Sequence, residues 1–306
     1  MTGRSMGGYV IASRPSTLAR IQAESVRRML EARGHRVGEL QVIRTTGDRV
    51  LDRPLPEIGG KGLFTAELEE ALRQGEIDLA VHSLKDLPLE SPPGIRVAAI
   101  PAREDPRDAL VSARYSSMAD LPPGAVVGSS SLRRQAQLLA VRPDLTIEPL
   151  RGNVETRLRK VAQGEFAAAV LAAAGLIRLG LTESIAERLS FDRMLPAPGQ
   201  GALAVQCRDD DEATLAALAD IDEPEIRRTV EAERAFLEGL GGGCSAPVGA
   251  YAQVEDGRLQ LAGLIASVDG KRIVRVRGEG NSPRELGSRL AEEALRQGAE
   301  ALLAHA

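Results

Sequence analysis

Short apolar runs alternate with stretches of helical periodicity over the first hundred residues of the chain. Between residues 16 and 33 apolar side chains recur at helical spacing, and Gly34 marks the end of this predicted helix. A second helix is expected over residues 65–73. Strands are expected around these helices, at residues 9–12, 37–43, 77–82 and 95–100. This β-α-β order favours a mainly parallel sheet with helices on both faces.

A similar pattern restarts after Asp105-Pro106-Arg107-Asp108 and predicts a second α/β unit. Helices are expected over residues 132–141 and 154–163. Strands are expected at residues 109–112, 125–127, 145–150 and 167–171, and at 202–207 after the break at Pro196-Ala197-Pro198-Gly199.

The last eighty residues have a different pattern. A helix over residues 225–240 is followed by three runs of alternating polarity, and a helix over 283–303 ends the chain. The runs, at residues 248–254, 259–268 and 272–278, are separated by Glu255-Asp256-Gly257 and Asp269-Gly270-Lys271. Such turns join antiparallel strands, so we expect a smaller α+β part with a three-stranded antiparallel sheet.

The length, net charge and apolar content of the chain restrict the classes of function that it can have. A chain of 306 residues is long enough for two or three domains. Its net charge of −4 argues against a general nucleic-acid binder, which is usually basic over a whole domain. No apolar run approaches the roughly 20 residues that span a bilayer, and the first residues lack the apolar core of a signal peptide. We therefore expect a cytoplasmic protein in which Cys207 and Cys244 are reduced.

Polar side chains follow four of the predicted strands. They lie in residues 82–86 (His-Ser-Leu-Lys-Asp), in residues 128–134 with three serines and two arginines, at Arg151 with Arg157, and at Arg178. A single arginine is most often a solvated surface residue. Four basic strand ends in succession favour an anion-binding cleft, because ligands of open α/β sheets bind outside the carboxyl ends of the strands.

Cys244 follows three glycines and precedes Ser245-Ala246-Pro247. This composition is typical of an open loop, where the thiol can be reached by something large. Cys207 lies inside an apolar run and is expected to be an inert core residue. Together with the arginines, Cys244 suggests a covalently tethered ligand that carries many carboxylates.

Taken together, these motifs resemble the hydroxymethylbilane synthase family, also called porphobilinogen deaminase, over nearly the whole chain. The resemblance rests on Arg14-Pro15-Ser16-Thr17-Leu18-Ala19, Thr45-Thr46-Gly47-Asp48, Gly59-Gly60-Lys61-Gly62-Leu63-Phe64, Lys85-Asp86, Glu104-Asp105-Pro106-Arg107-Asp108, residues 128–134, residues 151–157, Pro198-Gly199-Gln200-Gly201 and Gly242-Gly243-Cys244.

The resemblance implies a transferase of tetrapyrrole and haem biosynthesis. Four molecules of porphobilinogen are joined head to tail, with loss of ammonia, on a dipyrromethane cofactor held by a thioether. It also implies a monomer without a metal, a membrane or a nucleic-acid partner. The implied fold has two lobes like those of periplasmic binding proteins and a third domain with the anchoring cysteine. The implied domains are residues 1–101 with 199–221, residues 102–198, and residues 222–306, with hinges near residues 100–103 and 196–200.

The resemblance assigns residues as follows. Cys244 anchors the cofactor, and its other ligands are Lys85, Asp86, Ser129, Arg133, Arg134, Arg151 and Gly152. Substrate is bound by Arg14, Ser16, Lys61, Phe64, Arg157, Arg178 and Gln200. Lys61 belongs to a mobile lid. The chemistry agrees, because each pyrrole ring carries an acetate and a propionate, for which planar guanidinium groups are suitable partners.

Asp86 is the expected catalytic residue. Loss of ammonia leaves a cationic azafulvene whose charge spreads to the pyrrole nitrogen. A carboxylate beside the ring N–H stabilises that cation and can move the proton. It can act again when the coupled ring loses its α-proton.

Two rival hypotheses stay open at this point. One is a non-catalytic protein that binds an anion or solute between two lobes. The other is a different cysteine enzyme, with His82 as base and Cys244 as nucleophile. The sequence also departs from the family pattern at Glu57, where many relatives have a basic residue, at Gln206, where an acid is common, and at Ser129-Ser130-Ser131, which replaces a Thr-Ser-Ser run.

Overall fold

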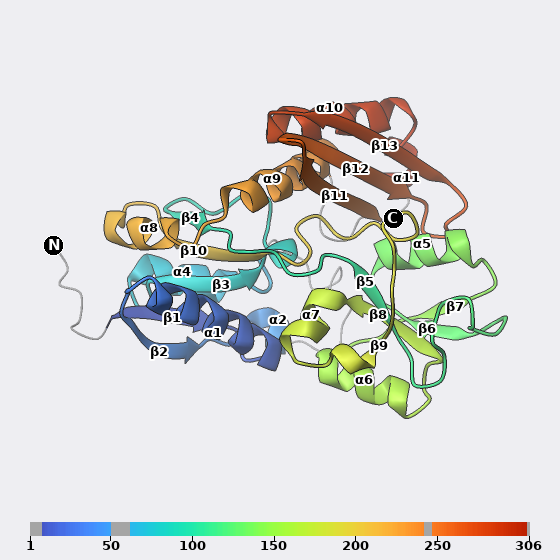
Figure 1. Ribbon diagram of the computed structural model, residues 1–306, viewed down its shortest axis with the longest axis horizontal. Helices are drawn as coiled ribbons and strands as arrows, with labels where there is room; N and C mark the ends of the chain where they lie inside the picture. The colour runs from blue at the N-terminus through green and yellow to red at the C-terminus, as the bar shows by residue number, and fades with distance from the viewer. Residues whose placement is uncertain (1–7, 50–61, 242–246, 305–306) are drawn as a thin grey trace. The chain divides into compact units, whose positions relative to one another are not determined.

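The computed structural model describes residues 8–49, 62–241 and 247–304, and the chain divides into two compact units (Figure 1). Unit 1 comprises residues 1–103 and 202–227, and unit 2 comprises residues 104–201 and 228–306. The chain therefore leaves unit 1, forms part of unit 2, and returns. The finer division into three domains stays a prediction.

Unit 1 contains a five-stranded sheet with the order β2-β1-β3-β10-β4. Its strands are β1 (Tyr9–Ser13), β2 (Val37–Val42), β3 (Leu79–Ser83), β4 (Ile95–Ala99) and β10 (Leu203–Arg208). β1 is parallel to β2 and β3, whereas β10 is antiparallel to β3 and β4. Four of the five strands thus run in one direction, which confirms the mainly parallel sheet.

Helices cover both faces of this sheet. On one face, α1 (Thr17–Ala32) and α8 (Glu212–Ala219) pack in a core with alternate strand residues such as Leu79 and Val81. On the other face, α4 (Ala66–Gln74) packs on Ala80. The period-2 alternation of β3 places its residues on opposite faces. The short α8 was missed at the sequence level, although Asp211 caps it by accepting from Thr214 N at 3.0 Å.

Unit 2 has a second sheet of five strands, in the order β7-β6-β8-β5-β9. They are β5 (Asp108–Val111), β6 (Val126–Gly128), β7 (Thr146–Glu148), β8 (Ala168–Ala172) and β9 (Ile185–Arg188). β6 is parallel to β7 and β8, and β5 is antiparallel to β8 and β9, so again one strand of five is reversed. In both units the reversed strand, β10 or β5, is the first one after the chain crosses between units.

Three helices follow strands of this sheet. They are α5 (Leu132–Val141), α6 (Val154–Ala162) and α7 (Ala173–Arg178). The sequence predicted the first two within one residue. It missed α7, because its residues continue the apolar run of β8 without a polar break. Arg178 consequently ends a helix, and its expected place at a strand end was wrong.

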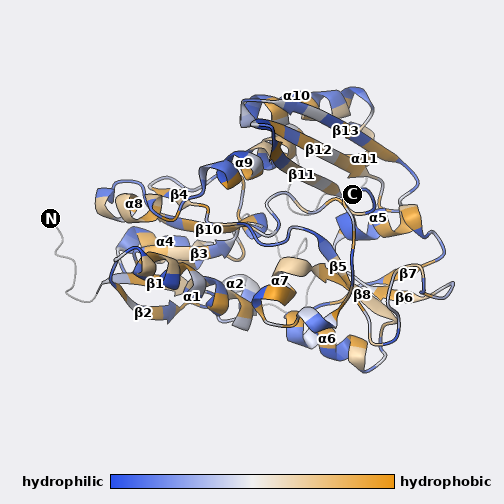
Figure 2. Ribbon diagram, viewed as in Figure 1, coloured by the Kyte–Doolittle hydropathy of each residue, from blue (hydrophilic) through white to orange (hydrophobic). Residues whose placement is uncertain are grey.

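The rest of unit 2 contains the expected antiparallel sheet, β11 (Val248–Glu255), β12 (Arg258–Ala266) and β13 (Ile273–Gly280). Asp256 and Gly257 both have positive φ, at 50° and 76°, as the hairpin turn between β11 and β12 requires. α9 (Pro224–Gly239) precedes the sheet, and α10 (Pro283–Arg296) packs on β12 and β13. The ribbon colours in Figure 2 show that hydrophilic and hydrophobic residues alternate along α10. The predicted helix over 283–303 is in fact two, because Gly298, with φ 92°, separates α10 from α11 (Glu300–Leu303).

Candidate functional site

Asp86 lies just beyond the carboxyl end of β3, on the short 3-10 turn η1 (Leu84–Asp86). The turn is fixed by its backbone, since Leu84 N donates to Ala202 O at 3.0 Å and Leu87 N donates to Leu84 O at 3.1 Å. The side chains of Leu84 and Leu87 are buried, whereas Asp86 is exposed. Two buried leucines therefore anchor an exposed carboxylate at the edge of the sheet.

Arg14 follows β1 at the same edge and is held on two sides. Its Nε and Nη2 donate to Asp48, and its guanidinium carbon lies 4.1 Å from the centre of the Phe64 ring, a cation–π contact. Asp48 also accepts from Thr45 Oγ1 at 2.8 Å. Burial alone would raise the pKa of Asp48, but hydrogen bonds from Arg14 and Thr45 lower it below its usual value.

A small cavity of about 80 Å³ lies at this edge of unit 1. It is lined by Arg14, Ser16, Leu18, Ala19, Gln22, Phe64, Thr65, Val81, His82, Ser83 and Asp86. Four residues that the sequence assigned to substrate or catalysis (Arg14, Ser16, Phe64 and Asp86) therefore surround one cavity. Ser16 also caps α1, because its Oγ accepts from Ala19 N at 3.2 Å.

His82 lies on β3 and is buried in the lining of this cavity. Burial lowers the pKa of His82 to about 4, a shift that the Gln206 side chain opposes and the charge of Arg14 reinforces. The imidazole is consequently neutral at pH 7 and a weak base. This counts against the rival hypothesis in which His82 activates a cysteine.

The corresponding edge of unit 2 collects the other candidate residues. β6, β7 and β8 are mutually parallel neighbours, so their carboxyl ends meet at one edge. Ser129 follows β6, Arg151 follows β7, and Arg178 ends the helix after β8. Three of the four predicted basic segments thus share an edge in unit 2, and residues 82–86 lie at the carboxyl edge in unit 1. The convergence of all four on one cleft stays a prediction.

Gly152 shapes the loop between Arg151 and α6. Its φ of 111° is rarely adopted by other residues, and an added Cβ would lie 2.8 Å from Thr156 Cγ2. The carbonyl of Gly152 accepts from Arg157 Nε at 2.8 Å. Asn153 caps α6 by accepting from Thr156 N at 2.9 Å. The backbone at this position therefore places Arg157 against the loop that carries Arg151.

Arg133 and Arg134, predicted to bind the cofactor, both pair with Asp108 in the interior of unit 2. Arg133 Nη1 donates to Asp108 Oδ2 at 2.7 Å, and Arg134 Nη2 donates to Oδ1 at 2.7 Å. Gln200 Nε2 donates to the same Oδ1 at 3.0 Å. One carboxylate thus orients two guanidinium groups, and this cluster of three charges carries a net positive charge.

Replacement of Asp108 by asparagine is expected to destabilise the protein by about 3–5 kcal/mol, because two buried guanidinium groups lose their counter-ion. Burial would raise the pKa of Asp108, but the charges of Arg133 and Arg134 hold it far below its usual range. The stabilisation of the folded protein by ionised Asp108 is therefore fully present above the pKa of this residue in the unfolded chain, about 3.9. It is lost as the pH falls toward the lower pKa that Asp108 has in the folded protein.

Urea denaturation at pH 7 followed by circular dichroism measures this effect. Asp144→Asn is the matched control, since Asp144 pairs with Arg142 near the surface, with Nη2–Oδ2 at 2.7 Å. We expect the control to leave the unfolding midpoint nearly unchanged. An Asp108→Asn protein as stable as the control would contradict the role of this cluster.

Arg178 is partly buried and donates from Nη2 to Gly201 O at 2.8 Å. Burial lowers the pKa of Arg178, and the charge of Glu104 opposes that shift. Among the remaining predicted residues, Lys85 is partly buried on η1. Cys244, Lys61 and Glu57 lie outside the described residues.

Sequence reasoning missed the two carboxylates that orient the arginines. Asp48 and Asp108 both lie in segments quoted for the family resemblance, and neither was given a role. The signal was present, because a carboxylate in a motif rich in basic residues is a candidate partner for them. Which arginine each one contacts depends on tertiary structure.

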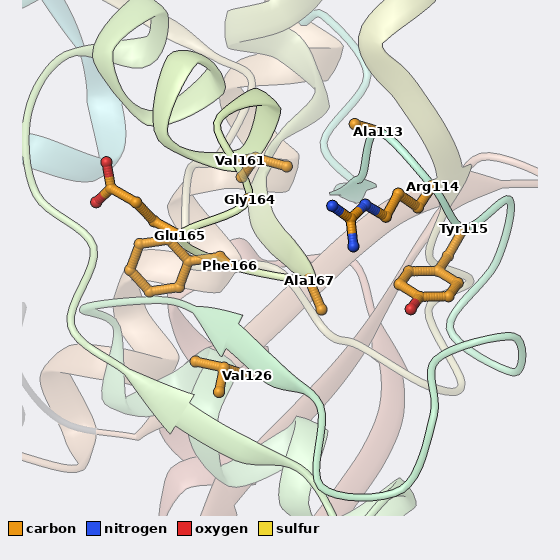
Figure 3. A pocket seen from close by; sticks show the side chains of 9 residues that line it. All are labelled: Ala113, Arg114, Tyr115, Val126, Val161, Gly164, Glu165, Phe166 and Ala167. Carbon is orange, nitrogen blue, oxygen red and sulfur yellow. The ribbon is translucent and has the colours of Figure 1, made fainter.

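A further cavity, of about 200 Å³, lies at the opposite end of the unit 2 strands (Figure 3). Its lining includes Val126, where β6 begins, and Ala167, just before β8, together with Arg114, Tyr115 and Glu165. It is therefore separate from the edge with the candidate residues. Among the described residues no cluster of His, Cys, Asp and Glu could hold a metal, and no helix is long and apolar enough to cross a membrane.

Comparison with known proteins identifies the family. A family model described as "Porphobilinogen deaminase, dipyromethane cofactor binding domain" matches residues 9–216, and one described as the porphobilinogen deaminase C-terminal domain matches residues 227–296. The chain belongs to the porphobilinogen deaminase family. A porphobilinogen deaminase of Thiobacillus denitrificans is 51% identical over 301 residues, which cover 97% of this chain and 98% of that protein. One from Roseiflexus castenholzii is 52% identical over 297 residues, covering 96% and 98%.

Solved structures of binding proteins are similar over part of the chain. A nutrient binding protein from Burkholderia cenocepacia bound to methionine is 15% identical with a TM-score of 0.44, over 71% of this chain and 93% of that chain. The methionine binding protein MetQ is 16% identical with a TM-score of 0.44, over 72% and 91%. These similarities say nothing about the ligand of this porphobilinogen deaminase family member.

Proposed function

We propose that the chain is a hydroxymethylbilane synthase in which Asp86 does the proton chemistry and Cys244 anchors a dipyrromethane cofactor. The reaction is the stepwise condensation of four porphobilinogen molecules, with release of ammonia, in tetrapyrrole biosynthesis. The observation that carries the proposal is the family match over both domains, including the domain named for the cofactor. Action as a monomer in the cytoplasm, without a nucleic-acid partner, is part of the same proposal.

The residues at the unit 2 edge suit a ligand that carries several carboxylates. The cluster of Asp108, Arg133 and Arg134 has two positive charges and one negative charge, and Arg151, Arg157 and Arg178 add further guanidinium groups. Guanidinium groups bind carboxylates bidentately. We propose that Ser129, Gly152 and these arginines hold the carboxylates of the cofactor and of the growing chain. When bound, the cofactor supplies the first nucleophilic pyrrole carbon.

We propose that Asp86, at the carboxyl edge of the unit 1 sheet, acts on the substrate. As the C–N bond of the aminomethyl group breaks, the electron pair leaves with nitrogen and positive charge develops over the pyrrole ring. The Asp86 carboxylate accepts the hydrogen bond of the ring N–H and stabilises that charge. It can hold or pass on the ring proton in the step that restores the aromatic pyrrole. Arg14, with Ser16 and Phe64 beside it, would bind a carboxylate of the same substrate.

The non-catalytic solute-binding hypothesis is not favoured by the family match. Acidic p-dimethylaminobenzaldehyde distinguishes the hypotheses, since bound pyrroles give a coloured product. We expect the purified holoenzyme to give colour that stays with the denatured protein, and to consume porphobilinogen with release of ammonia. A colourless protein that binds an anion without turnover would contradict the proposal.

A further inference from the structure

A line of buried polar side chains connects α4 to the unit 1 cavity. Gln206 on β10 donates from Nε2 to Glu69 Oε1 on α4 at 3.1 Å. His82 on β3 lies one diagonal position away on the same face, because Ala204 pairs with His82 and Gln206 pairs with Ala80. Gln206 is 0% exposed, His82 5% and Glu69 7%. The line therefore runs from Glu69 through Gln206 to an imidazole in the cavity lining.

Hydrogen-bond chemistry fixes the direction of this line. Glu69 as a carboxylate only accepts, so the carboxamide nitrogen of Gln206 faces Glu69 and its Oε1 faces away. Gln206 Oε1 and His82 Nε2 are both buried, and neither has a partner of ordinary hydrogen-bond geometry among the described residues. When His82 Nε2 carries the ring proton it is a donor, and Gln206 Oε1 is an acceptor that suits it. Nδ1 of a neutral imidazole is then an acceptor.

The cavity lining includes a carboxylate, Asp86, that can pair with a cationic group. Among the described residues of its lining, Arg14 and Asp86 are the charged ones, and Asp48 partly offsets Arg14. Among these three groups the Asp86 carboxylate is left uncompensated. A cavity of about 80 Å³ has room for a substituent of a pyrrole ring. A primary ammonium group supplies both the positive charge and the N–H donors.

We propose that His82 binds the protonated aminomethyl group of the pyrrole substrate by accepting its N–H at Nδ1, and that Gln206 and Glu69 hold the ring in the required tautomer. The inference rests on the proposed function, because it assigns one substituent of that substrate. Burial lowers the pKa of His82 to about 4, so the imidazole stays an acceptor at neutral pH. The charged groups around it are Arg14 after β1, Asp86 on η1 and Glu69 on α4, the last through Gln206.

Residue 206 is a glutamine, so the side chain beside His82 is a carboxamide and not a carboxylate. A carboxamide has no full negative charge, so its Oε1 raises the pKa of His82 less than a carboxylate at this position would. Gln206→Glu would place a negative charge beside the ring and raise the pKa of His82. The neutral state of His82 therefore depends first on its burial, and also on the lack of a full negative charge at residue 206.

Nitrogen-15 NMR of the histidine rings in the holoenzyme tests the tautomer directly, since the chain has three histidines, His35, His82 and His305. His82→Asn assigns the signal by its loss. We expect the His82 ring to carry its proton on Nε2 and not to titrate above pH 5, and Gln206→Glu to bring its titration toward neutral pH. A proton on Nδ1, or wild-type titration near 6.5, would overturn the inference.

Kinetics test the contact with substrate. We expect His82→Leu to raise KM for porphobilinogen about tenfold to a hundredfold, with kcat changed less than about threefold. His82→Asn keeps an acceptor close to the position of Nδ1 and should recover most of the affinity. His35→Gln is the control, because His35 pairs with Asp220 on the surface at 2.7 Å, away from the cavity lining.

The outcomes separate this inference from the proposed function. If the wild-type holoenzyme does not consume porphobilinogen, the proposed function fails. If it does, and both His82 variants have wild-type KM, the binding role of His82 is overturned while the function stands. Thermal unfolding of each variant is measured alongside, and a lowered Tm with unchanged KM would likewise overturn the binding role.

Discussion

Replacing Asp86 with asparagine is expected to lower kcat for porphobilinogen by about 10²–10⁴-fold while the protein stays folded. The amide is nearly isosteric with the carboxylate but has no charge to stabilise the cationic ring and cannot take its proton. The fold should be unaffected, because Asp86 is exposed and its turn is held by the buried Leu84 and Leu87. Steady-state release of ammonia and far-ultraviolet circular dichroism measure the two effects.

Two further variants sharpen this test. Asp86→Glu restores the charge at a displaced position and should keep a small part of the activity. Glu90→Gln removes an exposed acid from the next segment of the chain, outside the cavity lining, and should leave turnover unchanged. Wild-type turnover in Asp86→Asn would show that another group stabilises the cation.

The spacing of apolar residues, together with capping residues and glycines at the ends of segments, was sufficient to predict most elements of this fold. The apolar spacing of residues 16–33, with Ser16 before and Gly34 after, gave α1 almost to the residue. Local signals of this kind act within one element. The reversal of β5 and β10 depends on how the chain crosses between units, and no local pattern encodes it. β9 was missed for a related reason, because this four-residue strand is stabilised mainly by its pairing with β5.

The sequence was sufficient to predict which residues belong to the candidate site, but not which residue each of them contacts. Arg133 and Arg134 are visible in the sequence as two basic residues at the start of a helix. That both contact Asp108, on a strand that precedes them by more than twenty residues, follows only from the structure. The same holds for Arg14 with Asp48 and for Gln206 with Glu69. Sequence shows which charges exist, and folding decides which of them are neutralised.

Replacing Cys244 with serine is expected to abolish turnover and to remove the covalent cofactor. A serine hydroxyl is a much poorer nucleophile than a thiolate, so the thioether should not form. Cys207→Ser is the matched control. The Cys207 thiol is buried in β10, and burial raises its pKa to about 11, so it is unsuited to covalent attachment. The control should keep both the cofactor and the activity.

The intact mass of the purified holoenzyme tests the central claim most directly. The account predicts the mass of the 306-residue chain plus two porphobilinogen-derived rings, both for the wild type and for Cys207→Ser. It predicts the bare polypeptide mass for Cys244→Ser. A bare mass for an active wild type, or the added mass on the Cys244→Ser protein, would contradict it.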